Sequence, residues 1–309
     1  MLRSLQRLYR RALTSTGTAL LRVGGSRIDN HLAYLVGRAP AYYDTRVVPL
    51  GDDTALALLH GRILIYVDTR GADLAPHVMM FGIWEPSYTQ LFQRLIRPGD
   101  TVLDIGAHHG VYTLIGAFAT GAGGRLHAFE PNPRFAGLLR RSIAANGLGG
   151  IATLHEAAVG AEAAETELRW QWDYGGGGHL AIAGRRGNPA LERSPVQVVA
   201  LDEVFPDPAF TVDVIKMDVE GTETFAVRGM RALLARSPRV RLMLEFAPQM
   251  LAGHGGPAPE LVQELGALGF RFWSIGDNAA LAPIAPEALA AETTGIRNIL
   301  AARGDPFAA

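Results

Sequence analysis

Two acidic residues and two glycines between positions 101 and 133 form a pattern that favours binding of a nucleoside. Asp104 ends a short apolar stretch, and Gly106 and Gly110 follow it without a side chain that could obstruct a ligand. Glu130 ends a second apolar stretch, about 20 positions beyond the glycines. An acid at this distance from a glycine turn can accept hydrogen bonds from the two hydroxyls of a ribose.

The spacing of these residues separates two classes of nucleoside ligand. Dinucleotide sites use Gly-x-Gly-x-x-Gly to pack a turn around a pyrophosphate at a helix start. This chain has Asp-x-Gly-x-x-x-Gly, and Asp104 at the tip of the strand would repel a pyrophosphate. S-adenosylmethionine carries a ribose, an ammonium and a sulfonium but no phosphate. The motif therefore favours a methyl donor over NAD.

A second motif strengthens this interpretation through a family resemblance. Residues 215–223, Ile-Lys-Met-Asp-Val-Glu-Gly-Thr-Glu, resemble the hallmark of the FkbM family of S-adenosylmethionine-dependent methyltransferases. So do Leu-Asp-Ile-Gly-Ala at 103–107 and Phe-Glu-Pro-Asn-Pro at 129–133. The similarity runs from about Gly82 to Leu300. It implies a Rossmann-like α/β fold with the seven-stranded, mostly parallel sheet of class I methyltransferases, a bound S-adenosylmethionine and usually a hydroxyl acceptor.

The resemblance also implies a set of cofactor-binding positions. Glu130 would take the ribose hydroxyls, the pair at 157–158 would border the adenine, and the glycine turn would lie along the methionine and ribose. Relatives commonly have Ala-Asn where this chain has Ala107-His108, so the role of position 108 stays open. The full predicted set is Asp104, Gly106, Ala107, His108, Gly110, Glu130, Pro131, Ala157, Ala158 and Asp218.

Lys216, Asp218 and Glu220 are the main candidates for catalysis. Alternation along a strand puts them on one side, at the edge of the sheet where open α/β folds bind ligands. We favour a general base among these carboxylates, with Lys216, the only lysine in the chain, beside it. A second interpretation is structural, with Asp218 capping the next helix and Lys216 paired with Glu220. The least favoured is a divalent-cation site built from Asp218, Glu220 and Glu245, and we predict no resident metal.

Histidines and aromatic residues supply further candidates. His108 lies in the cofactor loop within plausible reach of the transferred methyl group, although loop histidines more often bond backbone or pack. His179 follows the glycine tract 175–178, which could cover the acceptor. Trp172 and Tyr174 precede that tract and could stack on a sugar or form one face of a hairpin. With Glu245, these three residues are the predicted acceptor-binding set.

Composition excludes several classes of protein. The chain has 309 residues, a net charge of −1 and no cysteine, which excludes disulfide scaffolds, thiolate nucleophiles and cysteine zinc sites. No stripe of basic and aromatic residues appears, so nucleic acid is not an expected partner. No apolar run approaches the roughly 18 residues of a membrane span. We expect a cytoplasmic protein whose partner is a small-molecule or glycan acceptor.

We divide the chain into an N-terminal extension, residues 1–75, and a methyltransferase domain, residues 76–309. Residues 1–28 carry six arginines and no acid before Asp29, in an amphipathic pattern. This segment could attach to an anionic membrane surface, but packing on the body of the protein or a frayed end is favoured. Two apolar runs, 56–59 and 63–68, predict a hairpin around His60-Gly61.

Beyond residue 76, apolar runs alternate with helical patterns, which predicts a mostly parallel sheet. Expected main strands cover 102–103, 125–129, 152–155, 213–219, 240–246, 270–275 and 299–302. Strand-like runs at 165–172 and 196–201 flank the glycine tract, and helices are expected at 88–96, 111–120, 135–146, 223–235 and 260–268.

These features together predict an O-methyltransferase that acts on a hydroxyl of a glycan, glycolipid or secondary metabolite. An N-methyltransferase, an NAD-dependent oxidoreductase and a non-catalytic cofactor-binding subunit are the alternatives.

Overall fold

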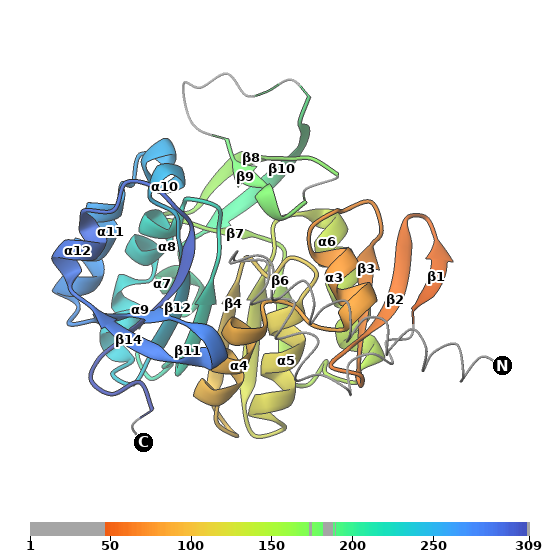
Figure 1. Ribbon diagram of the computed structural model, residues 1–309, viewed down its shortest axis with the longest axis horizontal. Helices are drawn as coiled ribbons and strands as arrows, with labels where there is room; N and C mark the ends of the chain where they lie inside the picture. The colour runs from red at the N-terminus through yellow and green to blue at the C-terminus, as the bar shows by residue number, and fades with distance from the viewer. Residues whose placement is uncertain (1–46, 173–174, 182–187, 189, 308–309) are drawn as a thin grey trace, which may run out of the picture.

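A computed structural model describes residues 47–172, 175–181, 188 and 190–307. Its centre is an eight-stranded sheet of order β14-β13-β15-β12-β11-β4-β5-β6 (Figure 1). The strands are β4 (Thr101–Ile105), β5 (Arg125–Phe129), β6 (Ala152–His155), β11 (Val214–Met217), β12 (Arg241–Phe246), β13 (Arg271–Ile275), β14 (Leu281–Ile284) and β15 (Arg297–Ala302). β6, β5, β4, β11 and β12 are parallel, whereas β15 is antiparallel to β12 and β13.

The predicted Rossmann-like α/β fold is confirmed, with one correction to the number of strands. Seven strands follow the expected arrangement, and β14 adds an eighth at the edge through antiparallel pairing with β13. Sequence patterns did not indicate this strand because it is short, largely exposed and contains Pro283. Proline is tolerated in such an edge position because no neighbour requires its missing N–H.

Both faces of the sheet are buried, and the strand residues alternate between two cores. In β4, Val102 packs into one hydrophobic cluster, whereas Leu103 and Ile105 pack into the other. The first cluster is covered by α3 (Leu74–Phe81), α4 (Pro86–Leu95), α5 (Val111–Thr120) and α6 (Pro133–Ala145). The second is covered by α7 (Leu201–Val204), α8 (Glu223–Gly229), α9 (Arg231–Arg236), α10 (Pro248–His254), α11 (Ala258–Ala267) and α12 (Pro286–Ala290). Strands buried on both faces are typical of parallel sheets covered by crossover helices.

The expected helix at 223–235 is two helices, which corrects the prediction. Gly229 ends α8 and lies against Gly160, the residue that follows β7. A Cβ added at Gly229 would lie 1.9 Å from the carbonyl oxygen of Gly160. A new helix begins at Arg231, and the carboxylate of Asp202 accepts from the backbone N–H groups of Ala232 (2.9 Å) and Leu233 (2.7 Å). An acid that accepts from the first N–H groups of a helix stabilises its start.

The predicted hairpin is present as β2 (Thr54–Leu59) and β3 (Ile63–Asp68), with β1 (Val48–Gly51) as a third antiparallel strand. His60 and Gly61 both have positive φ angles, 51° and 69°, as a tight reversal requires. Asn146, at the end of α6, exchanges hydrogen bonds with the backbone of Leu64 (3.0 and 2.6 Å). The inner face of this hairpin shares the cluster that α5 and α6 cover. The division at residue 75 stays a prediction, and residues 1–28 lie outside the described residues.

A smaller sheet of order β7-β10-β8-β9 lies at one end of the molecule, at the top of Figure 1. Its strands are β7 (Ala158–Val159), β8 (Ala164–Trp170), β9 (His179–Leu180) and β10 (Glu192–Val199). Between β8 and β9, Gly175–Gly177 forms a 3-10 turn, η2; a second one, η3, covers Asp277–Ala279. Within the described residues, no helix combines the length and apolar character needed to cross a membrane.

Candidate active site

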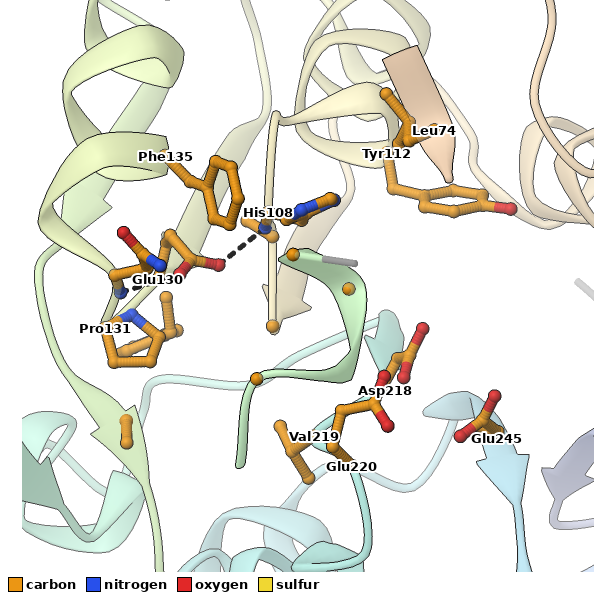
Figure 2. A pocket seen from close by; sticks show the side chains of 18 of the residues that line it. Leu74, His108, Tyr112, Glu130, Pro131, Phe135, Asp218, Val219, Glu220 and Glu245 are labelled. Carbon is orange, nitrogen blue, oxygen red and sulfur yellow. Dashed lines mark hydrogen bonds between the residues drawn. The ribbon is translucent and has the colours of Figure 1, made fainter. Parts of the chain in front are cut away.

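A cavity of about 320 Å³ lies where β4, β5 and β11 end. The turns that follow these strands supply much of its wall, including Gly106 to His108, Glu130 and Pro131, and Asp218 to Glu220. Figure 2 shows Glu130 and Phe135 on one side of this cavity and Asp218, Glu220 and Glu245 on the other. The carboxyl ends of parallel strands are the expected ligand-binding edge of an open α/β sheet.

Glu130 lines the cavity with a carboxylate that the backbone holds in place. Oε2 accepts from the N–H of His108 (2.6 Å, dashed in Figure 2), and Oε1 accepts from the N–H of Asn132 (2.7 Å). Burial, only partly offset by these two hydrogen bonds, raises the pKa of Glu130 to about 7. Each oxygen can still accept a second hydrogen bond, so the group is suited to the two hydroxyls of a ribose.

The two motif glycines have different surroundings. Gly106 lines the cavity at a φ of +78°, and a Cβ there would lie 1.9 Å from the carbonyl oxygen of Asp218. Gly110 precedes α5 at a φ of +89° and does not line the cavity; a Cβ there would lie 2.1 Å from a methyl carbon of Leu139. Gly110 therefore allows close packing between α5 and α6, and it is not among the residues that line the cavity, where the prediction expected it.

Asp104 does not line the cavity, contrary to the expected contact with a cationic ligand. Its side chain is fully buried, Oδ2 accepts from the hydroxyl of Thr113 (2.6 Å), and Oδ1 lies 4.0 Å from Nζ of Lys216. Burial raises the pKa of Asp104 although the charge of Lys216 opposes the shift. Asp104 thus forms a buried ion pair with the lysine and does not itself face the ligand cavity.

Lys216 and three carboxylates form the charged side of the cavity. Nζ of Lys216 donates to the carbonyl oxygen of Gly106 (3.2 Å) and lies 3.5 Å from Oδ2 of Asp218. Strand β11 ends at Met217, so the predicted alternation stops before Glu220, which lies in the following turn at a φ of +54°. Oxygens of Asp218, Glu220 and Glu245 nevertheless all lie within 4.8 Å of one another. We call these three residues the carboxylate cluster.

The proposed structural role for these residues does not match the contacts. Lys216 pairs with Asp218 and Asp104, and no ion pair with Glu220 occurs in the described part of the chain. No side-chain hydrogen bond from the described residues caps α8, and Glu223 accepts from backbone N–H groups of the turn before the helix, those of Val219 (3.2 Å) and Gly221 (3.4 Å). Asp218 therefore keeps a third of its side chain exposed, toward the cavity.

Electrostatics favour protons or a bound cation at the carboxylate cluster. Burial, followed by repulsion from Asp218, raises the pKa of Glu220 to about 9 and that of Glu245 to about 8. Burial alone would lower the pKa of Lys216, but the combined attraction of Asp218, Asp104 and Glu85 raises it. Three carboxylates would suit a hard divalent ion, but the ammonium of Lys216 already lies beside Asp218.

His108 lines the cavity as a neutral ring. It adopts a φ of +52° and packs edge-on against Phe135, with ring centroids 4.2 Å apart. Burial lowers the pKa of His108 to about 4, so the imidazole would be a weak base at neutral pH. Its Nε2 has no hydrogen-bond partner among the described residues.

The predicted acceptor residues are only partly at the cavity. Glu245 lines it, whereas His179 and Trp172 do not. Trp172 stacks beneath the guanidinium of Arg70, 3.3 Å from its ring centroid, and donates to Glu192 (3.1 Å). Trp172 makes these contacts because it packs against the smaller sheet and not against the cavity wall. Tyr174 lies outside the described residues.

The glycine tract does reach the cavity. The N–H of Gly176 donates to Oδ2 of Asp73 (2.7 Å), which also caps α3 through Oδ1. A Cβ on Gly175 would lie 2.4 Å from Phe135 and 3.3 Å from Nε2 of His108. The segment therefore covers the cavity at contact distance, as the expected cover over a ligand would.

Sequence reasoning missed several lining residues, among them Asp73, His77, Trp84, Glu85 and Tyr112. A usable signal was the succession Trp84-Glu85-Pro86, where a charged residue stands directly before a helix that begins with proline. Tyr112 lies in the first turn of α5, one of the resembling motifs, and no role was assigned to it.

The model of the methyltransferase FkbM domain matches residues 104–272, more than half of the chain. The chain belongs to the FkbM family. It is an S-adenosylmethionine-dependent methyltransferase. The cavity of this FkbM methyltransferase fits that donor, since Glu130 offers free acceptor sites and the lining includes four small residues, Gly106, Ala107, Ala157 and Ala158.

Solved structures with a similar fold include three methyltransferases. The S-adenosylmethionine-dependent O-methyltransferase from Thermotoga maritima is 16% identical, with 72% of this chain and 67% of that chain covered and a TM-score of 0.39. Precorrin-6y C5,15-methyltransferase from Geobacter metallireducens is 15% identical, with 77% of this chain and 95% of that chain covered and a TM-score of 0.41. The O-methyltransferase from Bacillus cereus in complex with S-adenosylhomocysteine is 13% identical, with 71% of this chain and 81% of that chain covered and a TM-score of 0.39. No curated protein matches the FkbM methyltransferase significantly in sequence.

Proposed function

We propose that this FkbM methyltransferase methylates a hydroxyl group of a glycan, glycolipid or secondary metabolite. The observation that carries the proposal is the carboxylate cluster of Asp218, Glu220 and Glu245, gathered within 4.8 Å at one side of the cavity. A hydroxyl acceptor must lose a proton during transfer, and a carboxylate at the cavity wall can accept it.

The chemistry divides between donor and protein. The bound donor supplies a methyl group on a sulfonium, and the C–S bond breaks as the acceptor oxygen bonds to the methyl carbon. The hydroxyl proton passes to the carboxylate cluster. Asp218, directly after β11, is the proposed acceptor of this proton, and the neighbouring ammonium of Lys216 stabilises its negative charge. Alignment of oxygen, carbon and sulfur in a covered cavity supplies on the order of 7–11 kcal/mol in favourable cases.

The lining of the cavity also supports a neutral acceptor. Lys216 is the only lysine or arginine among the lining residues that the structure describes, and it is already paired with carboxylates. A phosphate or carboxylate on the acceptor would meet the carboxylate cluster without a free cation. Trp84 lines the same cavity and offers an aromatic surface to a sugar or an apolar ring, the role that the sequence assigned to Trp172.

The same carboxylates favour one alternative, an amine acceptor. A protonated amine would be attracted to the carboxylate cluster and would lose its proton there before transfer, which needs a weaker base than an alcohol does. A divalent cation in the carboxylate cluster is a second way to lower the pKa of a hydroxyl. An NAD-dependent oxidoreductase does not agree with the family of the chain, whereas a non-catalytic subunit is one outcome of the test below.

The experiment measures methyl transfer from labelled S-adenosylmethionine to matched alcohols and amines, including neutral sugars, glycolipids and polyketide-like alcohols. Each reaction is run with EDTA and with Mg²⁺, for the wild type, Asp218→Asn and the exposed control Glu203→Gln. We expect transfer to alcohols that Asp218→Asn reduces about 10²- to 10⁴-fold. Transfer to amines alone, or no transfer despite donor binding, would overturn the proposal. Loss of activity in EDTA with rescue by Mg²⁺ would move the role of the cluster from base to metal site.

A further inference from the structure

Glu85 adopts a backbone conformation that its position in the fold does not explain. It precedes α4 with φ 40° and ψ 68°, in the left-handed region that residues other than glycine rarely adopt. It makes no side-chain capping hydrogen bond to the helix that it precedes. Strained residues that persist in a fold are concentrated at ligand sites. The conformation directs attention to the carboxylate of Glu85.

That carboxylate is held at the cavity wall by two other elements. Oε2 accepts from the hydroxyl of Tyr112 on α5 (2.7 Å), and Oε1 accepts from Nδ2 of Asn298 on β15 (3.0 Å). Both partners are neutral, and Glu85 makes no ion pair within the part of the chain that the structure describes. Each oxygen keeps a second acceptor site. Glu85 is therefore a fixed carboxyl group whose hydrogen-bond partners are neutral, although the charge of Lys216 attracts it without forming an ion pair.

The position of Glu85 relative to Glu130 indicates which part of the donor it would meet. With the ribose at Glu130 and the adenine beside Ala157 and Ala158, the methionine portion must extend toward the ends of β4 and β11. That portion carries one ammonium and one carboxylate. Asp104, a member of the predicted cofactor-binding set, is buried and does not line the cavity, and Asp218 is paired with Lys216.

We propose that Glu85 binds the α-ammonium of the methionine portion of S-adenosylmethionine, with Tyr112 and Asn298 as its positioning residues. The inference rests on the donor site and on the placement of the ribose at Glu130, and not on the identity of the acceptor. Glu85 is buried enough that its pKa is raised, by burial first and by Asp218 second. An ammonium bound beside it would favour the ionised carboxylate.

The test compares two ligands that differ in the methionine portion. Calorimetry measures the affinity of S-adenosylhomocysteine, which has the ammonium, and of 5′-methylthioadenosine, which lacks the amino-acid portion. For Glu85→Gln we expect S-adenosylhomocysteine to bind about 10- to 100-fold more weakly, with little change for 5′-methylthioadenosine. Glu203→Gln is the matched surface control and should bind both ligands like the wild type.

Four outcomes contradict or separate the assignments. An equal loss for both ligands in Glu85→Gln would indicate a structural role only and overturn the inference, as would no loss at all. If Glu85→Gln does not fold, Tyr112→Phe removes one anchor and should give the same selective loss at smaller size; an unselective loss overturns the inference. Selective loss together with no methyl transfer to alcohols would leave Glu85 assigned and overturn only the proposed acceptor.

Discussion

Glu130 illustrates how one side chain can couple ligand binding to pH. Its pKa is about 7 in the free protein because burial disfavours the charged form. Ribose hydroxyls donate hydrogen bonds to a carboxylate and therefore favour its ionised form. Binding must then lower this pKa, and the protein must release a proton to bind its ligand below pH 7.

We therefore predict that the affinity for S-adenosylhomocysteine rises from pH 6 toward pH 8, by up to about tenfold per pH unit below the pKa. Calorimetry at a series of pH values measures this dependence, with Glu130→Gln as the control. The variant should bind more weakly and lose the component of the pH dependence that Glu130 contributes. An identical pH profile in the variant and the wild type would show that Glu130 does not interact with the ligand.

Lys216 and Asp104 allow a prediction of coupling between buried charges. The side chain of Asp104 is fully buried, and that of Lys216 is 5% exposed, with Nζ 4.0 Å from Oδ1 of Asp104. Lys216→Met leaves the carboxylate without its cation, and removal of one partner of a buried pair costs about 3–5 kcal/mol. The double variant with Asp104→Asn should be less destabilised than the sum of the single variants. Urea unfolding measures the free energies of unfolding, and additive effects would mean that the pair is not coupled.

At the level of elements, the turns after β4 and β11 must come close together to form the floor of the cavity. Gly106 makes this possible, because its hydrogen faces the carbonyl oxygen of Asp218 where a Cβ would lie at 1.9 Å. A backbone oxygen has no rotamer that could relieve such a contact. The glycine therefore fixes the spacing between the donor loop and the first residue of the carboxylate cluster.

We predict that Gly106→Ala destabilises the protein by at least about 3 kcal/mol and weakens donor binding, through both the contact and its φ of +78°. Gly137→Ala, in the middle of α6 with no atom within 4 Å of the added Cβ, is the matched control. It should stabilise the protein by about 0.5–1 kcal/mol, since alanine is the better helix former. Thermal unfolding with and without S-adenosylhomocysteine measures both effects. Equal stability of the two variants would contradict this account of the turn.

How far sequence alone predicts this protein depends on the range of the interaction concerned. Strand ends are local features, so Glu130 and Asp218 could be placed at the ligand-binding edge of the sheet. The direction of a side chain at a strand end depends on neighbouring elements, which is why Asp104 and Gly110 were expected at a cavity that they do not line. Glu85 was missed for the same reason, because its role depends on contacts with α5 and β15, far away in the sequence.

The same limit applies to the elements themselves. Strongly periodic strands and helices of the sheet were predictable because each buries a continuous apolar face. The break between α8 and α9 depends on the approach of Gly160 and on Asp202, and β14 depends on an available edge of β13. Both features therefore depend on residues outside their own segments as well as on those within them.

At the scale of the whole molecule, carboxyl groups in and beside the active site make the free energy of unfolding depend on pH. Glu220, Glu245, Glu130 and Glu223 all have a raised pKa, about 9, 8, 7 and 7 respectively, against about 4.5 for an ordinary glutamate. The folded protein therefore binds more protons than the unfolded chain at intermediate pH. By linkage, the free energy of unfolding falls as pH rises through this range.

Buried histidines act in the opposite direction but in another window. The pKa values of His60, His108 and His127 are lowered to about 4 by burial, so they add stability as pH rises from about 4 to 6.5 and nothing above that. Between pH 6.5 and 9 the carboxylates alone should determine the slope.

We predict that the melting temperature falls across this interval, and that Glu220→Gln, which removes the group with the highest of these pKa values, flattens the fall most strongly above pH 7. Glu203→Gln, at an exposed site on α7, should leave the slope unchanged. A constant melting temperature in the wild type from pH 6.5 to 9 would mean that the carboxylates are neutralised in another way. Repeating the scan with Mg²⁺ and with EDTA then distinguishes a bound cation from protons, because a metal that binds only the folded protein raises its melting temperature most where the carboxylate cluster is ionised.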